Sequence, residues 1–174
     1  DYLFEAARGR KLAARDFLEA INYAFIDGDL LAKWQAVEGG VPLANPLSAE
    51  LGTMRTMLLP GLVAALGRNA ARQQSRVRLF EIGKVFAARN GEAPLETARI
   101  AAVVCGDAQA EQWGAQARPV DFHDLKGDLD SLATASGATL EYRQSQAAWG
   151  HPGRSADIQR DGERIGWIGQ LHPR

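Results

Sequence analysis

The spacing of hydrophobic residues changes within the first 40 positions of the chain. Residues 1–18 carry a broken helical spacing, with basic residues at the polar positions, and this predicts an N-terminal helical attachment. The period then falls to two, which predicts a strand over 19–25. Asp29 follows a turn and is predicted to cap a short helix that runs to residue 37.

A longer helix is predicted over 56–74, where leucine and alanine recur at helical spacing. Proline is tolerated in a helix only within its first turn, so Pro60 moves the start of this helix nearer to Leu59. Three strands are predicted over 77–87, 98–105 and 138–144. The second of them is apolar nearly throughout and is expected to be buried on both faces.

The last third of the chain predicts a helix and a hairpin. The helix spans 121–136, and Gly137 ends it. Two alternating segments, 156–160 and 164–168, flank the pair Asp161-Gly162, which is a strong signal for a two-residue hairpin. Because the predicted strands do not alternate strictly with helices, the fold class is α+β rather than a doubly wound parallel sheet.

Composition fits one soluble domain of 174 residues, with 46% hydrophobic and 24% charged residues. The formal net charge of −1 argues against a domain whose main task is to grip nucleic-acid phosphates. The longest apolar stretches are far shorter than a membrane helix requires, so no membrane partner is expected. Cys105 is the single cysteine and is expected to be a buried, inert residue in a reducing, cytoplasmic setting. The chain begins without Met, and we expect it to be a piece of a larger protein.

The residues that could carry chemistry form no known catalytic pattern. The three histidines and Cys105 show no zinc spacing, and no nucleophile elbow surrounds Ser155. Gly83-Lys84 is followed by Val85 instead of Ser or Thr, which excludes a phosphate-binding P-loop. One basic run remains open to two interpretations, a solvated helix end or a patch that contacts RNA or a partner. It consists of Arg68, Arg72, Arg76 and Arg78.

Six ordered sequence blocks, which span most of the chain, resemble the β subunits of bacterial phenylalanyl-tRNA synthetase in their catalytic-like core domain. The blocks are 45–47, 54–62, 79–86, 124–129, 151–156 and 166–173. Their motif residues are given structural roles. These residues are Asn45, Pro46, Arg55, Pro60, Gly61, Phe80, Glu81, Gly83, Phe86, Lys126, Gly127, His151, Pro152, Gly169, His172 and Pro173. We predict that Glu81 pairs with Arg55 in the interior.

This resemblance implies a class II aminoacyl-tRNA synthetase fold, an antiparallel β-sheet flanked by helices. It implies that residues 1–174 are a single catalytic-like domain from a larger subunit. In the catalytic α subunits of the family, a strand that corresponds to 83–88 carries an arginine that holds ATP, and here Ala87 stands in its place. A methyl group cannot neutralise or orient a phosphate. No catalytic, cofactor-binding or metal-binding residue is therefore expected in this chain.

The resemblance also implies the partners and the activity of the assembled enzyme. The chain would support assembly with the catalytic α subunit in a dimer of αβ pairs. The tryptophans Trp34, Trp113 and Trp149 are candidates for exposed interface anchors. The holoenzyme would be a cytoplasmic phenylalanine–tRNA ligase that uses ATP and Mg²⁺ to charge tRNA(Phe), while the fragment alone would be inactive. The alternative is an autonomous class II-like domain that binds ATP or an acyl-adenylate through other residues.

Overall fold

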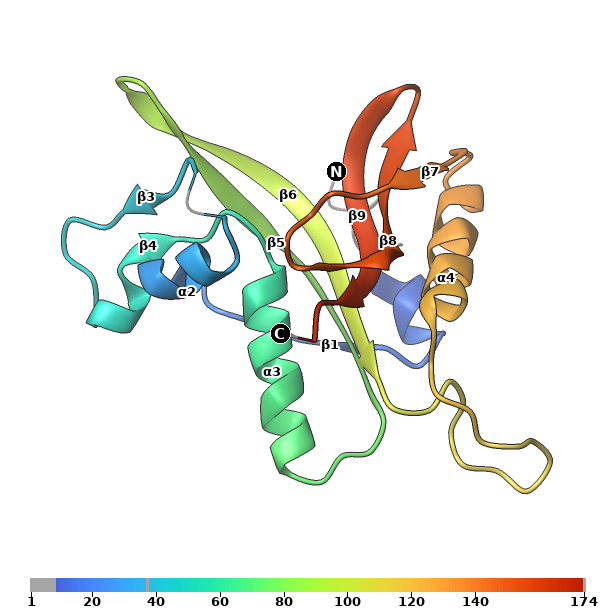
Figure 1. Ribbon diagram of the computed structural model, residues 1–174. Coiled ribbons are helices and arrows are strands. Elements are labelled where there is room, and N and C mark those ends of the chain that lie inside the picture. Colours follow the sequence, from blue (N-terminus) through green and yellow to red (C-terminus); the bar gives the residue numbers. More distant parts are fainter. Residues whose placement is uncertain (1–8, 37, 174) are drawn as a thin grey trace. The chain divides into compact units, whose positions relative to one another are not determined.

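The computed structural model describes residues 9–36 and 38–173, and its fold class is α+β, as predicted (Figure 1). The chain divides into two compact units, Asp1–Val104 and Cys105–Arg174. The strands form three small sheets of three strands each, two in the first unit and one in the second. Each unit has its own cluster of buried hydrophobic residues and is described by itself.

The larger sheet of the first unit has the order β1-β5-β6. It comprises β1 (Leu18–Glu19), β5 (Val77–Arg89) and β6 (Glu92–Cys105). A short β1 runs parallel to β5, and Asn90-Gly91 joins the long strands β5 and β6. Both long strands exceed their predicted lengths, because Asn90-Gly91 forms a tight turn and the two neighbouring strands extend up to it.

The predicted burial of the strand over 98–105 on both faces is wrong. Within β6 only Val103 is buried, and Cys105 is exposed rather than buried. An apolar strand at the edge of its sheet has a neighbouring strand on one side only, which leaves more of its side chains accessible.

The second sheet of the first unit is antiparallel, with the order β2-β4-β3. It comprises β2 (Phe25–Ile26), β3 (Val41–Pro42) and β4 (Thr53–Met54). Helix α2 (Gly28–Lys33) and the 3₁₀ helix η1 (Ala49–Leu51) lie between these strands in the sequence. Asp27, and not the predicted Asp29, caps α2, because its side chain accepts a hydrogen bond from the Asp29 amide. The helix ends at Lys33, and the predicted end at residue 37 lies outside the described residues.

The predicted elements at the start of the chain are shorter in the structure. Residues 9–13 are helical and residues 14–16 form a turn, in which Asp16 adopts a φ of 70°. The first eight residues of the predicted helix lie outside the described residues. The strand predicted over 19–25 is mostly irregular, and Ile21 and Tyr23 within it are 93% and 74% exposed. The alternating pattern there does not mark a buried sheet face.

Helix α3 (Leu59–Ala71) covers the larger sheet and begins where the proline argument placed it. Pro60 lies in its first turn, where a missing backbone N–H costs little. The buried core under this helix is formed by Leu62, Ala65, Val77, Leu79 and Val103. This packing holds β5, which carries several of the sequence motifs.

The second unit is an antiparallel sheet with the order β7-β8-β9 and one helix. Its elements are α4 (Phe122–Thr134), β7 (Glu141–Gln144), β8 (Gly150–Arg160) and β9 (Glu163–Leu171). Hydrophobic residues of α4 pack on buried Ala156, Ile158 and Ile168 of the sheet. The predicted hairpin is confirmed, since Asp161 and Gly162 adopt φ values of 53° and 82° between the paired strands.

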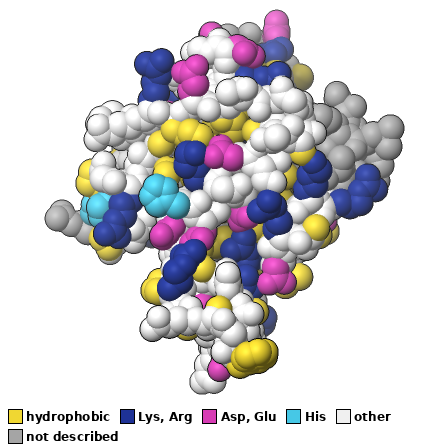
Figure 2. Space-filling model, turned by 90° about the vertical axis from the view of Figure 1, so that its right-hand side faces the viewer, with side chains coloured by type: hydrophobic (Ala, Val, Ile, Leu, Met, Phe, Trp, Pro, Cys, Tyr) yellow, Lys and Arg dark blue, Asp and Glu magenta, His cyan; other side chains and the backbone are white. Residues whose placement is uncertain are grey.

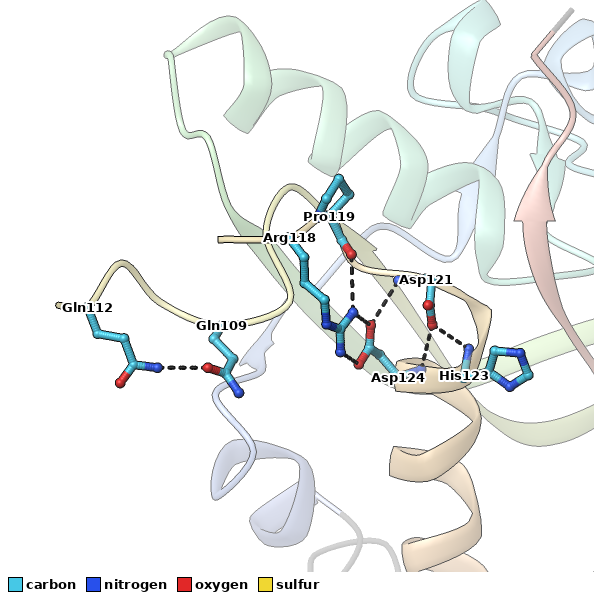
Figure 3. A network of polar contacts seen from close by, with 7 residues as sticks. All are labelled: Gln109, Gln112, Arg118, Pro119, Asp121, His123 and Asp124. Carbon is cyan, nitrogen blue, oxygen red and sulfur yellow. Dashed lines mark hydrogen bonds and ion pairs between the residues drawn. The ribbon is translucent and has the colours of Figure 1, made fainter. Parts of the chain in front are cut away.

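A network of polar side chains fixes the start of α4 (Figure 3). The Asp121 carboxylate accepts hydrogen bonds from the amides of His123 and Asp124, and the Asp124 carboxylate accepts one from the Asp121 amide. This reciprocal capping box satisfies amides that the first helical turn leaves unpaired. Arg118 donates two hydrogen bonds to Asp124, at 2.7 and 2.5 Å, and this contact raises the pKa of Arg118.

Strand β8 bulges outward between Gly150 and Ser155. Gly150 pairs with Leu171 and Ser155 with Gly169, so β8 advances five positions where β9 moves by two. Residues 151–154 supply the extra length of β8 in this irregularity.

Among the described residues, no helix is long and apolar enough to cross a membrane.

Candidate functional site

The sequence motifs of the first unit converge on a buried ion pair between Arg55 and Glu81. The Arg55 Nη1 atom lies 2.6 Å from Glu81 Oε1, and the two side chains are only 7% and 3% exposed. The pairing predicted from the sequence is thus confirmed. Arg55 follows β4 and Glu81 lies in β5, so the pair joins the small sheet of this unit to its larger sheet.

Hydrogen bonds around this pair occupy both partners. Arg55 Nε donates to the Lys84 carbonyl at 2.9 Å, and Nη1 also donates to the Tyr23 carbonyl at 3.4 Å. The second oxygen of Glu81 accepts a hydrogen bond of 2.7 Å from the Asn22 side-chain amide. Both carboxylate oxygens are therefore engaged, which is the condition under which a buried charge pair is tolerated.

Glycine is required beside this ion pair because the backbone approaches it closely. A Cβ atom at Gly83 would lie 2.3 Å from Arg55 Nη2 and would overlap the guanidinium group. A Cβ atom at Gly61 would lie 3.2 Å from the Cβ of Asn22, the residue that binds Glu81. The close packing around this one ion pair therefore explains why both motif positions hold glycine.

The remaining motif residues of β5 and α3 support the same site. Phe80 and Pro60 are buried, and the Phe86 amide donates to the Arg55 carbonyl at 2.9 Å. Asn45 and Pro46, by contrast, lie in an exposed bend between β3 and η1. Ala87, one position beyond Phe86, is exposed and presents only a methyl group.

The four arginines of the predicted basic patch differ in their surroundings. Arg68 and Arg72 are exposed at the end of α3. Arg76 lies 2.6 Å from Asp16, and Arg78 is buried with its guanidinium 4.2 Å from the ring centre of Phe17. An accessible patch therefore rests on Arg68 and Arg72, whereas the buried Arg78 serves packing.

In the second unit, Lys126 belongs to a polar cluster that joins α4 to β7. Asp130 accepts hydrogen bonds from Lys126 at 2.7 Å and from the Tyr142 hydroxyl at 2.5 Å. Lys126 also lies 4.4 Å from the centre of the Tyr142 ring, a cation–π contact. The side chains of Lys126 and Asp130 are 33% and 42% exposed, so water reaches this cluster.

The two acidic groups of this cluster shift their pKa values in opposite directions. Partial burial acts to raise the pKa of Asp130, but hydrogen bonds from Lys126 and Tyr142 outweigh it and lower that pKa. Burial, and next the hydrogen bond to Asp130, raise the pKa of Tyr142. Both shifts favour the state in which a neutral phenol donates to a carboxylate.

The other motif residues of the second unit shape the bulge and the strand ends. The His151 carbonyl accepts a hydrogen bond from Ser155 Oγ at 2.9 Å, and its Nδ1 atom accepts one from the Gly153 amide. A Cβ atom at Gly169 would lie 2.5 Å from Ser155 Cβ, so only glycine fits there. The four remaining motif residues lie apart from this packing. Pro152 and Pro173 are exposed, Gly127 faces open space on α4, and the His172 amide donates to the Trp149 carbonyl.

Sequence reasoning missed two groups of polar residues. Asn22 completes the Arg55–Glu81 site, and its position within a predicted strand gave no sign of this contact. In the second unit, Asp157 accepts hydrogen bonds from the buried Ser145 and from Arg164. The alternation of the hairpin strands could have placed Asp157 and Arg164 on one face, but not Ser145.

Grouped charges or a cluster of metal ligands would be further candidate sites on the part of the chain that the structure describes. Positive and negative side chains are intermixed on the face that Figure 2 shows. Within residues 9–36 and 38–173, no three His, Cys, Asp or Glu side chains are grouped to hold a metal ion. The best-defined polar sites are thus the pair Arg55–Glu81, which is buried, and the cluster around Asp130, which is partly open to water.

Comparison with known proteins identifies one consistent group of relatives. The family model described as the phenylalanyl tRNA synthetase beta chain CLM domain matches residues 2–174. The chain is 65% identical over 173 residues to the phenylalanine--tRNA ligase beta subunit of Xanthomonas campestris pv. campestris (strain 8004), which covers 99% of this chain. It is 66% identical over 166 residues to the corresponding subunit of Xylella fastidiosa (strain 9a5c), which covers 94% of it.

The chain spans only 22% and 21% of the length of these two curated relatives. In fold it is similar to the solved structure of a pyrrolysyl tRNA synthetase, Desulfitobacterium hafniense PylSc. That comparison has a TM-score of 0.65 at 19% identity and covers 99% of this chain and 59% of the other. It shows a likeness of fold alone.

Proposed function

The chain belongs to the family of the phenylalanyl-tRNA synthetase β chain CLM domain, and from that premise we propose that it is a non-catalytic, synthetase-like core. It supports assembly of a phenylalanine–tRNA ligase with the catalytic α subunit, in a dimer of αβ pairs. The assembled enzyme works in the cytoplasm and charges tRNA(Phe), with ATP and Mg²⁺ bound by other parts of the assembly. The names of the relatives do not favour an autonomous domain that binds ATP or an acyl-adenylate.

The saturated ion pair Arg55–Glu81 is the observation that carries this proposal. Its arginine is 6% exposed and is bound to a carboxylate and to backbone carbonyls. Such a guanidinium cannot also reach a phosphate, because removing it from Glu81 would leave an unpaired buried carboxylate. Ala87, further along β5, stands at the position where the family resemblance places an ATP-binding arginine.

We further propose the finer arrangement of class II synthetases, an antiparallel sheet flanked by helices, for this chain. The likeness to a pyrrolysyl tRNA synthetase over 99% of the chain supports it. Residues 1–174 then form one catalytic-like domain of a larger subunit, with an attachment within residues 1–18 whose described helical part is 9–13.

Two measurements on the purified proteins test this function. The full-length β chain, co-expressed with its α subunit, is expected to elute with it in size-exclusion chromatography and to catalyse ATP–pyrophosphate exchange with phenylalanine. The 174-residue chain alone is expected to give no exchange above background. Exchange by the 174-residue chain alone would overturn the non-catalytic role, and separate elution of the two full-length subunits would overturn the assembly role.

A further inference from the structure

An exposed tryptophan at the tip of a closed loop is the feature that the proposed function leaves unexplained. Trp113 is 102% exposed, and it lies in a loop that leaves β6 and returns to α4. The sequence offered Trp34, Trp113 and Trp149 as interface anchors, and only Trp113 of these three is fully accessible. Tryptophan is among the residues most enriched at interface hot spots, so a fully exposed indole held on a closed loop is a candidate contact residue.

The base of this loop is fixed by backbone contacts. Asp107 and Pro119 form an isolated bridge across it. The Ala108 amide donates to the Arg118 carbonyl at 3.0 Å, and the Val120 amide donates to the Gly106 carbonyl at 2.9 Å. Loops with closed ends of this kind frequently carry function.

Side chains fix the loop further (Figure 3). Arg118 binds Asp124 through two hydrogen bonds and also donates to the Pro119 carbonyl at 3.2 Å, which ties the returning arm to the start of α4. On the outgoing arm, Gln112 next to Trp113 donates to Gln109 at 2.7 Å. The base of the loop and the arm that leads to Trp113 are therefore held by internal contacts, which reduces the entropy that docking would cost.

The charges of the loop decide which class of partner fits it. Its single cation, Arg118, is neutralised by Asp124, and the exposed acid Glu111 lies two positions before Trp113. A nucleic-acid partner that stacked a base on the indole would bring phosphates against this acid with no cation to offset them. A protein surface with an apolar pocket and a basic rim is complementary to the loop.

We propose that the loop 107–119 is a docking finger that inserts Trp113 into an apolar, basic-rimmed pocket on the α subunit of the ligase. This inference rests on the proposed function. The indole fills the pocket, and Glu111 faces the cations at its rim. The bridge between Asp107 and Pro119 together with the Arg118–Asp124 contact holds the finger in its binding conformation.

Oxidative footprinting of the assembled enzyme tests the proposal without any variant. Full-length β chain and α subunit are purified as a complex, and oxidation of Trp113 is measured by mass spectrometry after a pulse of hydroxyl radicals. A peptide of residues 107–119 is the fully accessible reference. We expect oxidation of Trp113 in the complex to be at least about fivefold slower than in the peptide. Equal rates in an intact complex would overturn the docking finger while leaving the proposed assembly role in place.

The occupant of the finger is tested by two further footprints. Protection of Trp113 in the full-length β chain purified without the α subunit would show that the indole is covered by its own chain, and would overturn the proposal. Protection of Trp113 that appears only after tRNA is added would show that the loop binds RNA, and would also overturn the proposal. If the two subunits fail to associate at all, the proposed function fails instead.

Variants then measure the contribution of the finger to affinity. Trp113→Ala is expected to weaken the association of the α subunit at least about 30-fold, the effect of losing one hot-spot residue. Glu111→Lys is expected to weaken it severalfold at low salt and less at high salt, because the rim charge is screened. Leu47→Ala and Glu50→Lys, at exposed positions in the first unit, are the matched controls and should leave the affinity unchanged. Wild-type affinity in Trp113→Ala would overturn the proposal.

Discussion

The first unit buries its central ion pair, whereas the second leaves its central ion pair in contact with water. Arg55 and Glu81 are less than a tenth exposed, but Lys126 and Asp130 are about a third or more exposed. Arg55–Glu81 joins two sheets and Lys126–Asp130 lies within one turn of α4, yet both have N–O distances near 2.6 Å. Two ion pairs with similar N–O distances can therefore differ in what they contribute to stability. Losing one partner costs more at the buried pair, because the remaining charge is left without water or a counter-ion.

Removal of Arg55 is expected to have the largest effect. Arg55→Ala leaves Glu81 buried without its counter-ion and should lower the free energy of unfolding by about 3–5 kcal/mol. Hydrogen exchange followed by mass spectrometry should show the loss of protection in β4 and β5 before β7–β9. The double variant Arg55→Met, Glu81→Met removes both charges and should recover most of the loss. Full stability of Arg55→Ala in urea unfolding would contradict the comparison.

Among the described glycines of the second unit, Gly169 leaves the least space for a side chain. A Cβ atom there would lie 2.7 Å from the Cα of Ser155, which is backbone and cannot move aside. Gly169→Ala should therefore destabilise the chain by about 2 kcal/mol through overpacking. Gly127→Ala is the matched control, since Gly127 lies within α4 with open space around it, and it should raise the stability by up to about 1 kcal/mol. Equal outcomes for the two variants in thermal unfolding would refute the packing argument.

The exposed cluster around Asp130 should contribute less, and its contribution should depend on pH. Asp130→Asn is expected to cost about 1 kcal/mol at pH 7, because solvent screens the pair. The pKa of Asp130 is lowered in the folded chain, so its stabilisation is present above the unfolded pKa of about 4 and is lost as the pH falls through the folded value.

Urea unfolding of the parent and of Asp130→Asn at pH 7 and near pH 2.5 measures this contribution. The difference between the two proteins should shrink at the lower pH. Glu141→Gln is the control, because Glu141 lies 3.7 Å from Arg143 with both side chains more than half exposed. A difference between parent and Asp130→Asn that stays constant with pH would show that Asp130 acts through shape rather than charge.

The two exposed arginines of the predicted basic run, Arg68 and Arg72, should have the smallest effect on stability. Replacing Arg68 and Arg72 together by Ala should change the free energy of unfolding by less than about 0.5 kcal/mol. If they contact tRNA in the assembled enzyme, the alanine variant should show a weaker dependence of tRNA affinity on salt. The slope of log affinity against log salt concentration should fall in magnitude by about 1 to 2. Replacement of both by Lys keeps the charges and should preserve the slope. An unchanged slope in the alanine variant removes the patch from the tRNA contacts.

Local sequence signals predicted the elements that depend on local physics. Pro60 fixed the start of α3, and Asp161-Gly162 fixed the turn of the β8–β9 hairpin, because the backbone angles of these residues leave few choices. The strand predicted over 19–25 failed for the opposite reason. Its alternating pattern requires a neighbouring strand to bury one face, and the sequence does not show whether such a neighbour exists.

The polar site was predicted only in its charged part. Arg55 and Glu81 stand in sequence blocks that suggest burial, and opposite charges suggest a pair. Asn22 and the close approach of Gly83 to the guanidinium could not be predicted, because both depend on how the small and the larger sheets of the first unit meet. Of the three tryptophans expected to be exposed, Trp113 is fully exposed, but Trp34 and Trp149 are half-buried because tertiary contacts that the sequence does not show cover them.

The single cysteine has a practical consequence. Cys105 is exposed and stands where the chain passes from the first compact unit to the second. A maleimide dye would therefore attach at one defined position without removal of any other thiol. Trp34 lies in the first unit, and the other three tryptophans lie in the second. In the 174-residue chain, energy transfer from single-tryptophan variants to that dye would report the distance from the junction to each tryptophan.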